Sequence, residues 1–337
     1  MSNKKMHSKD KIYRAAIIGA GRIAAGFDTP QHKDILTHAH AFVVHPCTSL
    51  VGLFDIDKSK ATKVAKKWST KSFKTVEDML KKTEPEIVSV CTPDNTHYAV
   101  LKSLVKYRPK LVICEKPLTT KLDDTEKIIN QFESLKIPLL VNYSRRFDRT
   151  LQKFRKEIGS NKYGKVIATV GYYSKGILHN GSHLIDLSRW FFGDVMWSQV
   201  LSSLVDYRKD DPTVSAVMSF ERCSNFYLVG GDERKYGIFE LDILFEKARF
   251  RIKDFGFSIT TQKISKDKLY PEFKVLDQEK FTPTLLGNAM FELVSNVVYY
   301  LDRKTTHLVC DGQDALKVQR ICHNLLKKNN ICRDLLS

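Results

Sequence analysis

Residues 15–24 read AAIIGAGRIA, a short apolar run that leads directly into a glycine-rich turn. The last six letters fit the pattern G-x-G-x-x-G/A, with Ala24 in the final position. Gly19 permits a tight turn, Gly21 lets the backbone approach a pyrophosphate, and Ala24 allows close helix packing. The stretch therefore predicts the first strand, turn and helix of a dinucleotide-binding fold. The alternative is a tight turn that binds nothing.

Short β-branched runs alternate with helical patterns from residue 12 to about 142. This alternation is typical of a parallel, doubly wound sheet. After about residue 147, strand-like runs follow one another with few helices between them, which predicts an open, mostly antiparallel sheet. We therefore predict an α/β Rossmann domain over residues 1–145. An α+β substrate-binding and oligomerisation domain is expected over residues 146–337, with a last helix that can pack back on the first domain.

Composition favours a globular protein that works on a small molecule. The chain has 337 residues, 42% hydrophobic and 28% charged, which is enough for two ordinary cores. No apolar segment long enough for a signal peptide or membrane span follows the basic N-terminus, so we expect a cytoplasmic protein with no membrane partner. Seven dispersed cysteines without C-x-x-C spacing indicate reduced thiols, and nothing in the sequence predicts a metal site.

The formal net charge of +17 raises the possibility of nucleic-acid binding. The basic residues are spread over helix surfaces and loops without forming a single aromatic-interleaved stripe, so we expect no nucleic-acid partner. Most of the excess charge is expected to be solvated surface. The remaining interpretation is attraction of an anionic substrate such as a sugar nucleotide.

The second strand-like run ends in Leu53-Phe54-Asp55-Ile56-Asp57. An acidic residue at such a strand tip accepts hydrogen bonds from the ribose hydroxyls and repels a 2′-phosphate, so Asp55 favours NAD over NADP. Asp55 lies 36 positions after Gly19 (55 − 19), more than the roughly 20 expected. An insertion over about residues 26–37 explains the excess. Asp57 is the alternative, although it suits a helix cap better.

Several ordered motifs resemble those of one family. They are the GAGRIA turn, HAHAF, CTPDNTH at 91–97, EKP at 115–117, NYSRRF at 142–147, GSHLIDL at 181–187 and DGQDA at 311–315. Together they resemble the Gfo/Idh/MocA family, named for glucose-fructose oxidoreductase and inositol dehydrogenase, over nearly the whole chain. The resemblance implies an NAD(P)-dependent dehydrogenase or reductase acting on a CH–OH group of a sugar, cyclitol or nucleotide-linked sugar.

The same resemblance implies a cofactor site at the ends of the Rossmann strands. The predicted cofactor-binding residues are Gly19, Gly21, Arg22, Ile23, Asp55, Thr92, Pro93, Asn95, His97, Glu115, Lys116 and Asn142. The family often has a cis peptide bond at the position of Lys116–Pro117.

Oxidation of a secondary alcohol needs a hydride acceptor and a group that takes the hydroxyl proton. Lys116 is the first candidate for the proton-transfer role, and His183, the histidine of the G-x-H-x-x-D-L signature, is the second. The family commonly has Asp four residues before this histidine, where this chain has His179. His179 is therefore a third catalytic candidate, unless it only packs or caps. His183 also has a structural alternative, at the start of its helix.

Four further residues are candidate substrate contacts: Tyr173, Lys175, Asn180 and Arg146. A guanidinium can bind two oxygens of a carboxylate or phosphate, although a surface ion pair is an equal alternative for Arg146. A catalytically inactive, dinucleotide-binding regulatory module is the main competing function. We also expect a homodimer or homotetramer, because an open sheet with apolar residues on its outer face needs a covering partner.

Overall fold

The computed structural model of the chain describes residues 11–334, and it describes side-chain surroundings up to residue 329. Two compact units make up the described part of the chain: residues 11–142 with 288–312, and residues 143–287 with 313–334. The prediction from sequence placed residues 288–312 in the second domain, whereas their contacts place them in the first unit.

The first unit is built on a five-stranded parallel sheet in the order β2-β1-β3-β4-β5. The strands are β1 (Tyr13–Ile18), β2 (Thr48–Phe54), β3 (Ile87–Val90), β4 (Leu111–Glu115) and β5 (Leu139–Asn142). The strand order reverses between β1 and β3, which makes this pair the topological switch point of the sheet. Ligands of open α/β sheets bind outside the carboxyl ends of the strands at such a point.

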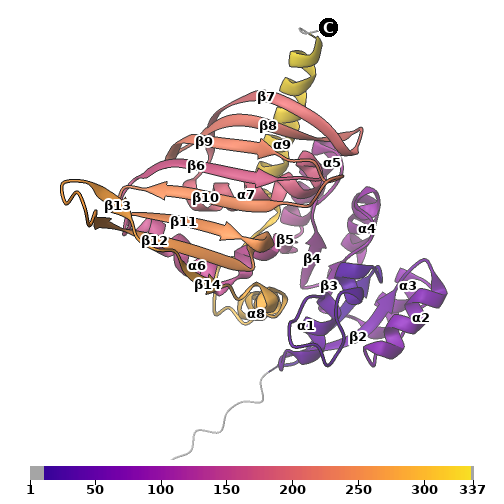
Figure 1. The fold of residues 1–337 in the computed structure, drawn as a ribbon. Helices are drawn as coiled ribbons and strands as arrows, with labels where there is room; N and C mark the ends of the chain where they lie inside the picture. The colour runs from indigo at the N-terminus through magenta and orange to yellow at the C-terminus, as the bar shows by residue number, and fades with distance from the viewer. Residues whose placement is uncertain (1–10, 335–337) are drawn as a thin grey trace, which may run out of the picture. The chain divides into compact units, whose positions relative to one another are not determined.

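Helices alternate with these strands along the chain (Figure 1). They are α1 (His38–Val44), α2 (Lys58–Lys67), α3 (Val76–Thr83), α4 (His97–Leu104), α5 (Leu122–Ser134) and the returning α8 (Ala289–Leu301). α8 packs against α1, where the rings of His45 and Phe291 lie 5.0 Å apart. The end of α8 is also held at β1, because the Tyr13 hydroxyl donates a 2.7 Å hydrogen bond to Asp302.

The second unit contains a nine-stranded sheet in the order β13-β12-β11-β10-β6-β9-β8-β7, with β14 paired to β12. Its pairs are antiparallel except β6 with β9. The strands are β6 (Val166–Tyr173), β7 (Val195–Arg208), β8 (Asp211–Phe220), β9 (Cys223–Gly230), β10 (Phe239–Phe245), β11 (Ala248–Lys253), β12 (Ser258–Lys266), β13 (Lys274–Leu276) and β14 (Lys280–Pro283). The predicted fold class, a Rossmann domain followed by an open, mostly antiparallel sheet, is confirmed.

Three helices cover one face of this sheet (Figure 1). They are α6 (Arg149–Gly159), α7 (Ser182–Phe192) and α9 (Gly312–Asp334). Aromatic side chains join the two layers: the Phe154 ring of α6 stacks against Phe250 of β11 at 4.5 Å and meets Phe191 of α7 edge-on at 5.4 Å. Burial of these rings is the main favourable term that holds the helices on the sheet.

Candidate active site

The glycine turn of the first unit lies at the switch point between β1 and β3. Gly19 has φ +98°, and a Cβ at this position would lie 2.6 Å from the carbonyl oxygen of Cys91. Only glycine fits, because both the backbone angle and the space exclude a side chain. Gly21, the next glycine of the motif, precedes a short π-helical turn over Arg22–Gly26. The glycine turn and the first residues of this π-helical turn therefore contain four of the predicted cofactor residues: Gly19, Gly21, Arg22 and Ile23.

Asp55 follows β2 and is hydrogen-bonded to the glycine turn. Its Oδ2 accepts from the Ala20 N–H at 2.6 Å and lies 3.3 Å from Lys60 Nζ, while its Oδ1 accepts from the Asp57 N–H at 3.0 Å. Burial opposes ionisation, but these two N–H donors and the Lys60 ammonium lower the pKa of Asp55. An anionic carboxylate is thus held at the strand tip. Asp57 caps α2 by accepting from the Lys60 N–H at 3.0 Å.

The segment between the glycine turn and α1 is an ordered loop held by Asp28. This buried carboxylate accepts from the Leu36 N–H at 2.7 Å and the Thr37 hydroxyl at 2.6 Å, and it pairs with His40 Nδ1 at 2.9 Å. Sequence reasoning found the insertion but missed Asp28. Its partners are eight to twelve residues away in the chain and form no known motif.

The loop after β3 carries the predicted residues Thr92, Pro93, Asn95 and His97. Pro93 and Asn95 are exposed, and Thr92 is half-buried. His97 is 1% exposed, and its two ring nitrogens lie 2.8 Å from the carbonyl oxygens of Pro117 and Thr92. His97 therefore joins the β3 loop to the Lys116–Pro117 segment, whose peptide bond is cis. Both ring nitrogens are thus used within the protein, so His97 is better suited to position the Lys116–Pro117 segment than to contact a cofactor directly.

Glu115, at the end of β4, belongs to a buried polar chain. Its Oε1 accepts from Asn142 Nδ2 at 2.7 Å and lies 2.8 Å from His38 Nε2. The other ring nitrogen of His38 lies 2.8 Å from the Ser89 hydroxyl. Burial opposes ionisation, but hydrogen bonding and charge from His38, with Asn142, lower the pKa of Glu115. Sequence reasoning named Glu115 and Asn142 but missed His38 and Ser89, although the HAHAF motif contains His38.

The His38–Glu115 pair predicts a pH-dependent contribution to stability. Burial alone would lower the pKa of His38, but the neighbouring Cys91 sulfur and Glu115 raise it from 6.5 to about 10. A group with a raised pKa stabilises the fold fully below its ordinary pKa and loses that contribution as the pH rises through the folded-state value. The stability lost in His38→Gln is therefore expected to be largest near pH 6.5 and to shrink toward about pH 10.

Denaturant unfolding of wild type and His38→Gln across this pH range measures the effect. His32→Gln is the matched control, because His32 is exposed and lies in the insertion that precedes α1. A stability difference that stays constant with pH would contradict a charged His38.

In the second unit, two aspartates of β7 and β8 hold the segment that precedes α7. The Lys175 N–H donates to Asp206 at 2.8 Å, and the Leu178 and His179 N–H groups donate to Asp211 at 2.7 and 2.9 Å. Lys175 has φ +74°, a strained angle for a residue with a side chain. Sequence reasoning missed both aspartates, since Asp211 is 32 residues from His179.

His179 and His183 lie on the helical segment that runs from Gly176 into α7. His179 is exposed, and its ring lies 5.0 Å from Tyr207. His183 is half-buried and meets the Tyr143 ring edge-on at 5.5 Å. The structure thus places His179 in the turn just before α7 and His183 in the first turn of α7, while Lys116 follows β4 in the first unit.

Two predicted substrate contacts have structural partners instead. Tyr173 is 0% exposed, and its hydroxyl donates to the Val214 carbonyl at 2.9 Å and accepts from the Val214 N–H at 2.7 Å. Arg146 is 2% exposed and binds Asp186 through Nε and a terminal nitrogen at 2.7–3.0 Å, with Asp314 at 2.9 Å. Burial and pairing of these groups argue against substrate contact at both positions.

Lys175 and Asn180 keep accessible side chains. The Lys175 Nζ lies 3.4 Å from Glu233 and 5.5 Å from the centre of the Tyr207 ring. Asn180 is half-buried. Both remain predicted substrate contacts.

The part of the chain that the structure describes offers neither a metal cluster nor a membrane-spanning helix. No group of three or more His, Cys, Asp or Glu residues there has metal-binding geometry. No helix in the same range is long and apolar enough to cross a membrane.

Comparisons with known proteins identify the first unit. Residues 13–143 match the family model described as oxidoreductase family, NAD-binding Rossmann fold. This match confirms the predicted NAD-binding fold.

A myo-inositol 2-dehydrogenase of Thermotoga maritima is 26% identical over 153 residues, which are 45% of this chain and 42% of that protein. A glucose-6-phosphate 3-dehydrogenase of Bacillus subtilis is 26% identical over 163 residues, 48% of this chain and 42% of that protein. The matched region is thus less than half of each relative.

Solved structures share the fold over almost the whole chain. The WlbA dehydrogenase from Bordetella pertussis, in complex with NADH and UDP-GlcNAcA, has a TM-score of 0.76 at 16% identity and covers 96% of this chain and 97% of its own. The UDP-N-acetylglucosamine 3-dehydrogenase GnnA from Acidithiobacillus ferrooxidans has a TM-score of 0.72 at 16% identity, covering 94% and 97%. At these identities the likeness concerns the fold alone.

Proposed function

We propose that the chain is an NAD(H)-dependent dehydrogenase or reductase of the Gfo/Idh/MocA oxidoreductase family, whose model matches residues 13–143. It transfers a hydride to or from a secondary alcohol or ketone of a sugar, cyclitol or nucleotide-linked sugar. The observation that carries this proposal is the glycine turn at the β1–β3 switch point, with the Asp55 carboxylate beside it.

The first unit offers a fit for a dinucleotide. Gly19 and Gly21 leave the backbone open to a pyrophosphate, and the N–H groups after them suit phosphate oxygens. Asp55 already accepts backbone hydrogen bonds at the tip of β2, where its remaining lone pairs suit the ribose hydroxyls. A bound nicotinamide would supply hydride acceptance or donation. This chain's own groups bind and orient the reactants and move the hydroxyl proton.

Proton transfer is assigned to Lys116, with His183 as the second candidate. Lys116 lies next to the Glu115 carboxylate in the chain, and the Lys116 charge helps to lower the pKa of Glu115. An ammonium group at this position stabilises a developing alkoxide and can take or return its proton. His179, Lys175 and Asn180 are proposed to contact substrate from the segment that precedes α7.

An anionic substrate fits the charge balance best. The chain carries +17, and a positive field raises the local concentration of anions. His179 in place of a carboxylate removes a charge that would repel such a substrate. A sugar phosphate or sugar nucleotide is therefore proposed before a neutral cyclitol.

We further propose a cytoplasmic homo-oligomer formed through the sheet of the second unit. Large apolar side chains stay exposed on its strands: Ile167, Met196, Trp197, Leu201, Leu204, Tyr227, Val229 and Leu244. A contiguous apolar surface on a sheet is commonly covered by a partner subunit. The reduced thiols Cys91, Cys114 and Cys223 agree with a reducing compartment.

Titration with NADH and NADPH, followed by nicotinamide fluorescence, tests the cofactor assignment. Wild type is expected to bind NADH more tightly than NADPH, and Asp55→Ala is expected to weaken NADH binding about tenfold to a hundredfold, since each hydrogen bond to a charged group contributes about 1.5–3 kcal/mol. Asp57→Ala is the matched control, because Asp57 caps α2 and does not bind the glycine turn.

Asp55→Asn separates the two roles of the carboxylate. It keeps an acceptor for the Ala20 N–H but loses the negative charge, so its preference for NADH over NADPH should decrease while the fold is retained. If neither nucleotide binds wild type, the proposed function fails. NADH binding without turnover of any sugar, sugar phosphate or sugar nucleotide would favour the competing function, a non-catalytic dinucleotide-binding module.

A further inference from the structure

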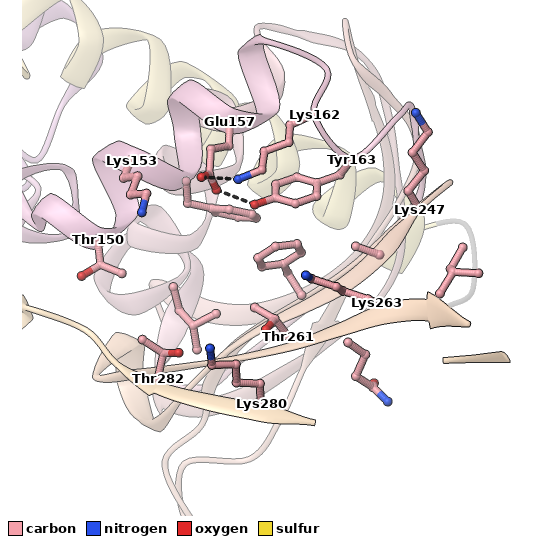
Figure 2. A pocket seen from close by; sticks show the side chains of 16 residues that line it. Thr150, Lys153, Glu157, Lys162, Tyr163, Lys247, Thr261, Lys263, Lys280 and Thr282 are labelled. Carbon is pink, nitrogen blue, oxygen red and sulfur yellow. Dashed lines mark hydrogen bonds and ion pairs between the residues drawn. The ribbon is translucent and has the colours of Figure 1, made fainter. Parts of the chain in front are cut away.

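A pocket lies in the second unit, between α6 and the strands β11, β12 and β14 (Figure 2). Its volume is about 610 Å³, within the range of pockets that hold small organic ligands. None of the predicted cofactor, catalytic or substrate residues lines it. The pocket is therefore unexplained by the proposed oxidoreductase site.

The inner wall of the pocket is aromatic. The rings of Phe154 and Tyr163 lie 4.5 and 4.6 Å from that of Phe250, and Ala248 and Ile259 extend the apolar surface. Phe154, Phe250 and Ile259 are each less than a tenth exposed. Such a wall suits the flat or branched apolar body of a ligand.

The rim of the pocket is basic. Five lysines line it against one carboxylate, Glu157: they are Lys153, Lys162, Lys247, Lys263 and Lys280. Glu157 already has two partners: it pairs with Lys162 Nζ at 2.7 Å and accepts a short hydrogen bond from the Tyr163 hydroxyl. Its charge is therefore balanced by Lys162, and the other four lysines have no carboxylate partner among the lining residues. Within the described residues, Lys263 and Lys280 make no ion pair and no side-chain hydrogen bond.

The ammonium groups converge on the hollow from different elements. Figure 2 shows the side-chain ends of Lys153 from α6, Lys263 from β12 and Lys280 from β14 directed toward it, whereas the end of Lys247 points away. Cations gathered around an apolar surface repel one another, and an anion placed among them removes that repulsion. Thr261 and Thr282, which also line the pocket, can donate hydroxyl hydrogen bonds to the same anion.

We propose that this pocket binds an amphipathic organic anion. The apolar body of the ligand rests on Phe154, Tyr163 and Phe250, and its sulfonate, phosphate or carboxylate lies between Lys263 and Lys280. Both features are required together: the aromatic wall alone would accept neutral compounds, and the lysines alone would bind inorganic anions only weakly, because ion pairs in water gain little without an apolar surface beside them.

Two fluorescent probes that differ only in one sulfonate group, and therefore in charge, test the proposal. Anilinonaphthalene sulfonate carries the anion, and phenylnaphthylamine is its neutral analogue. The full-length protein is titrated with each probe in the presence of saturating NADH, which keeps the probes out of a dinucleotide site. The sulfonate is expected to bind about tenfold more tightly than the neutral probe, as one charge-assisted contact of about 1.5 kcal/mol predicts.

Three variants locate the binding. Lys263→Glu with Lys280→Glu should weaken sulfonate binding about tenfold or more and leave the neutral probe nearly unchanged. Lys156→Glu with Lys165→Glu is the matched control, because it makes the same charge change at exposed positions of the same unit that do not line the pocket. Thr261→Trp, which fills the pocket from β12, should abolish binding of both probes.

Several outcomes would overturn the proposal. They are equal binding of the two probes, equal loss of sulfonate binding in the pocket and control double variants, no sulfonate binding in the presence of saturating NADH, or full competition by inorganic phosphate at concentrations similar to the probe. Circular dichroism of each variant separates a lost site from a lost fold.

Discussion

Replacement of Arg146 by methionine is expected to lower the free energy of unfolding by about 3–5 kcal/mol, the usual cost of breaking a buried ion pair by removal of one partner. Arg146 is 2% exposed and Asp186 1% exposed. The guanidinium binds both oxygens of Asp186 at 2.7–3.0 Å and Asp314 at 2.9 Å. Methionine fills much of the same volume, so the loss comes mainly from Asp186 left unpaired.

The protonation of Asp186 gives this prediction a pH dependence. Burial raises the pKa of Asp186 even beside Arg146, whose charge opposes the shift. Without Arg146 the carboxyl becomes still harder to ionise, so the destabilisation should be smaller in mildly acidic solution, where Asp186 is protonated, than at neutral pH. Urea unfolding at both pH values measures the difference.

A double variant separates the lost pair from lost packing. Arg146→Met with Asp186→Leu removes both charges and should recover part of the stability lost in the single variant, because an apolar pair of similar volume often replaces a buried ion pair at little cost. A loss below about 1 kcal/mol in the single variant, typical of a surface pair, would mean that Arg146 is not buried as described.

Arg146 also shows what sequence reasoning could not reach. The NYSRRF motif marked the position as important, and a forked guanidinium suits a substrate phosphate as well as a carboxylate. Its partners are 40 and 168 residues away in the chain, and no local pattern reveals them. The same holds for Asp211, which fixes the backbone of His179 from strand β8. Contacts of this kind depend on the complete fold.

Features set by local patterns were predictable. The periodicity of hydrophobic residues and the runs of β-branched residues located the strands. The G-x-G-x-x-A spacing located the turn at the end of β1, because the backbone angle and the space at Gly19 admit only glycine. Predicted cofactor residues come at the ends of successive parallel strands, so the sheet itself gathers them at one edge. The return of α8 to the first unit was missed, since an apolar helix of this length fits either core.

Lys116→Ala is expected to reduce kcat about a hundredfold to ten-thousandfold, the usual contribution of a positioned proton-transfer group, while NADH affinity changes little. Lys121→Ala is the matched control, an exposed lysine on the same loop after β4. Turnover is measured with the best substrate from a screen of sugar phosphates, sugar nucleotides and cyclitols. Lys116→Arg keeps the positive charge but exchanges protons poorly, so its kcat should also fall, although its substrate affinity is retained.

The two candidate proton-transfer groups are distinguished by the pH profile of kcat. If Lys116 takes the proton, His183→Ala should lower the rate less than Lys116→Ala and leave the apparent pKa of the wild-type profile in place. If His183 takes the proton, the change of kcat near neutral pH disappears in His183→Ala and persists in Lys116→Ala. A Lys116→Ala enzyme that keeps more than about a tenth of wild-type kcat would exclude lysine from proton transfer, because that loss is below the range for general acid–base catalysis.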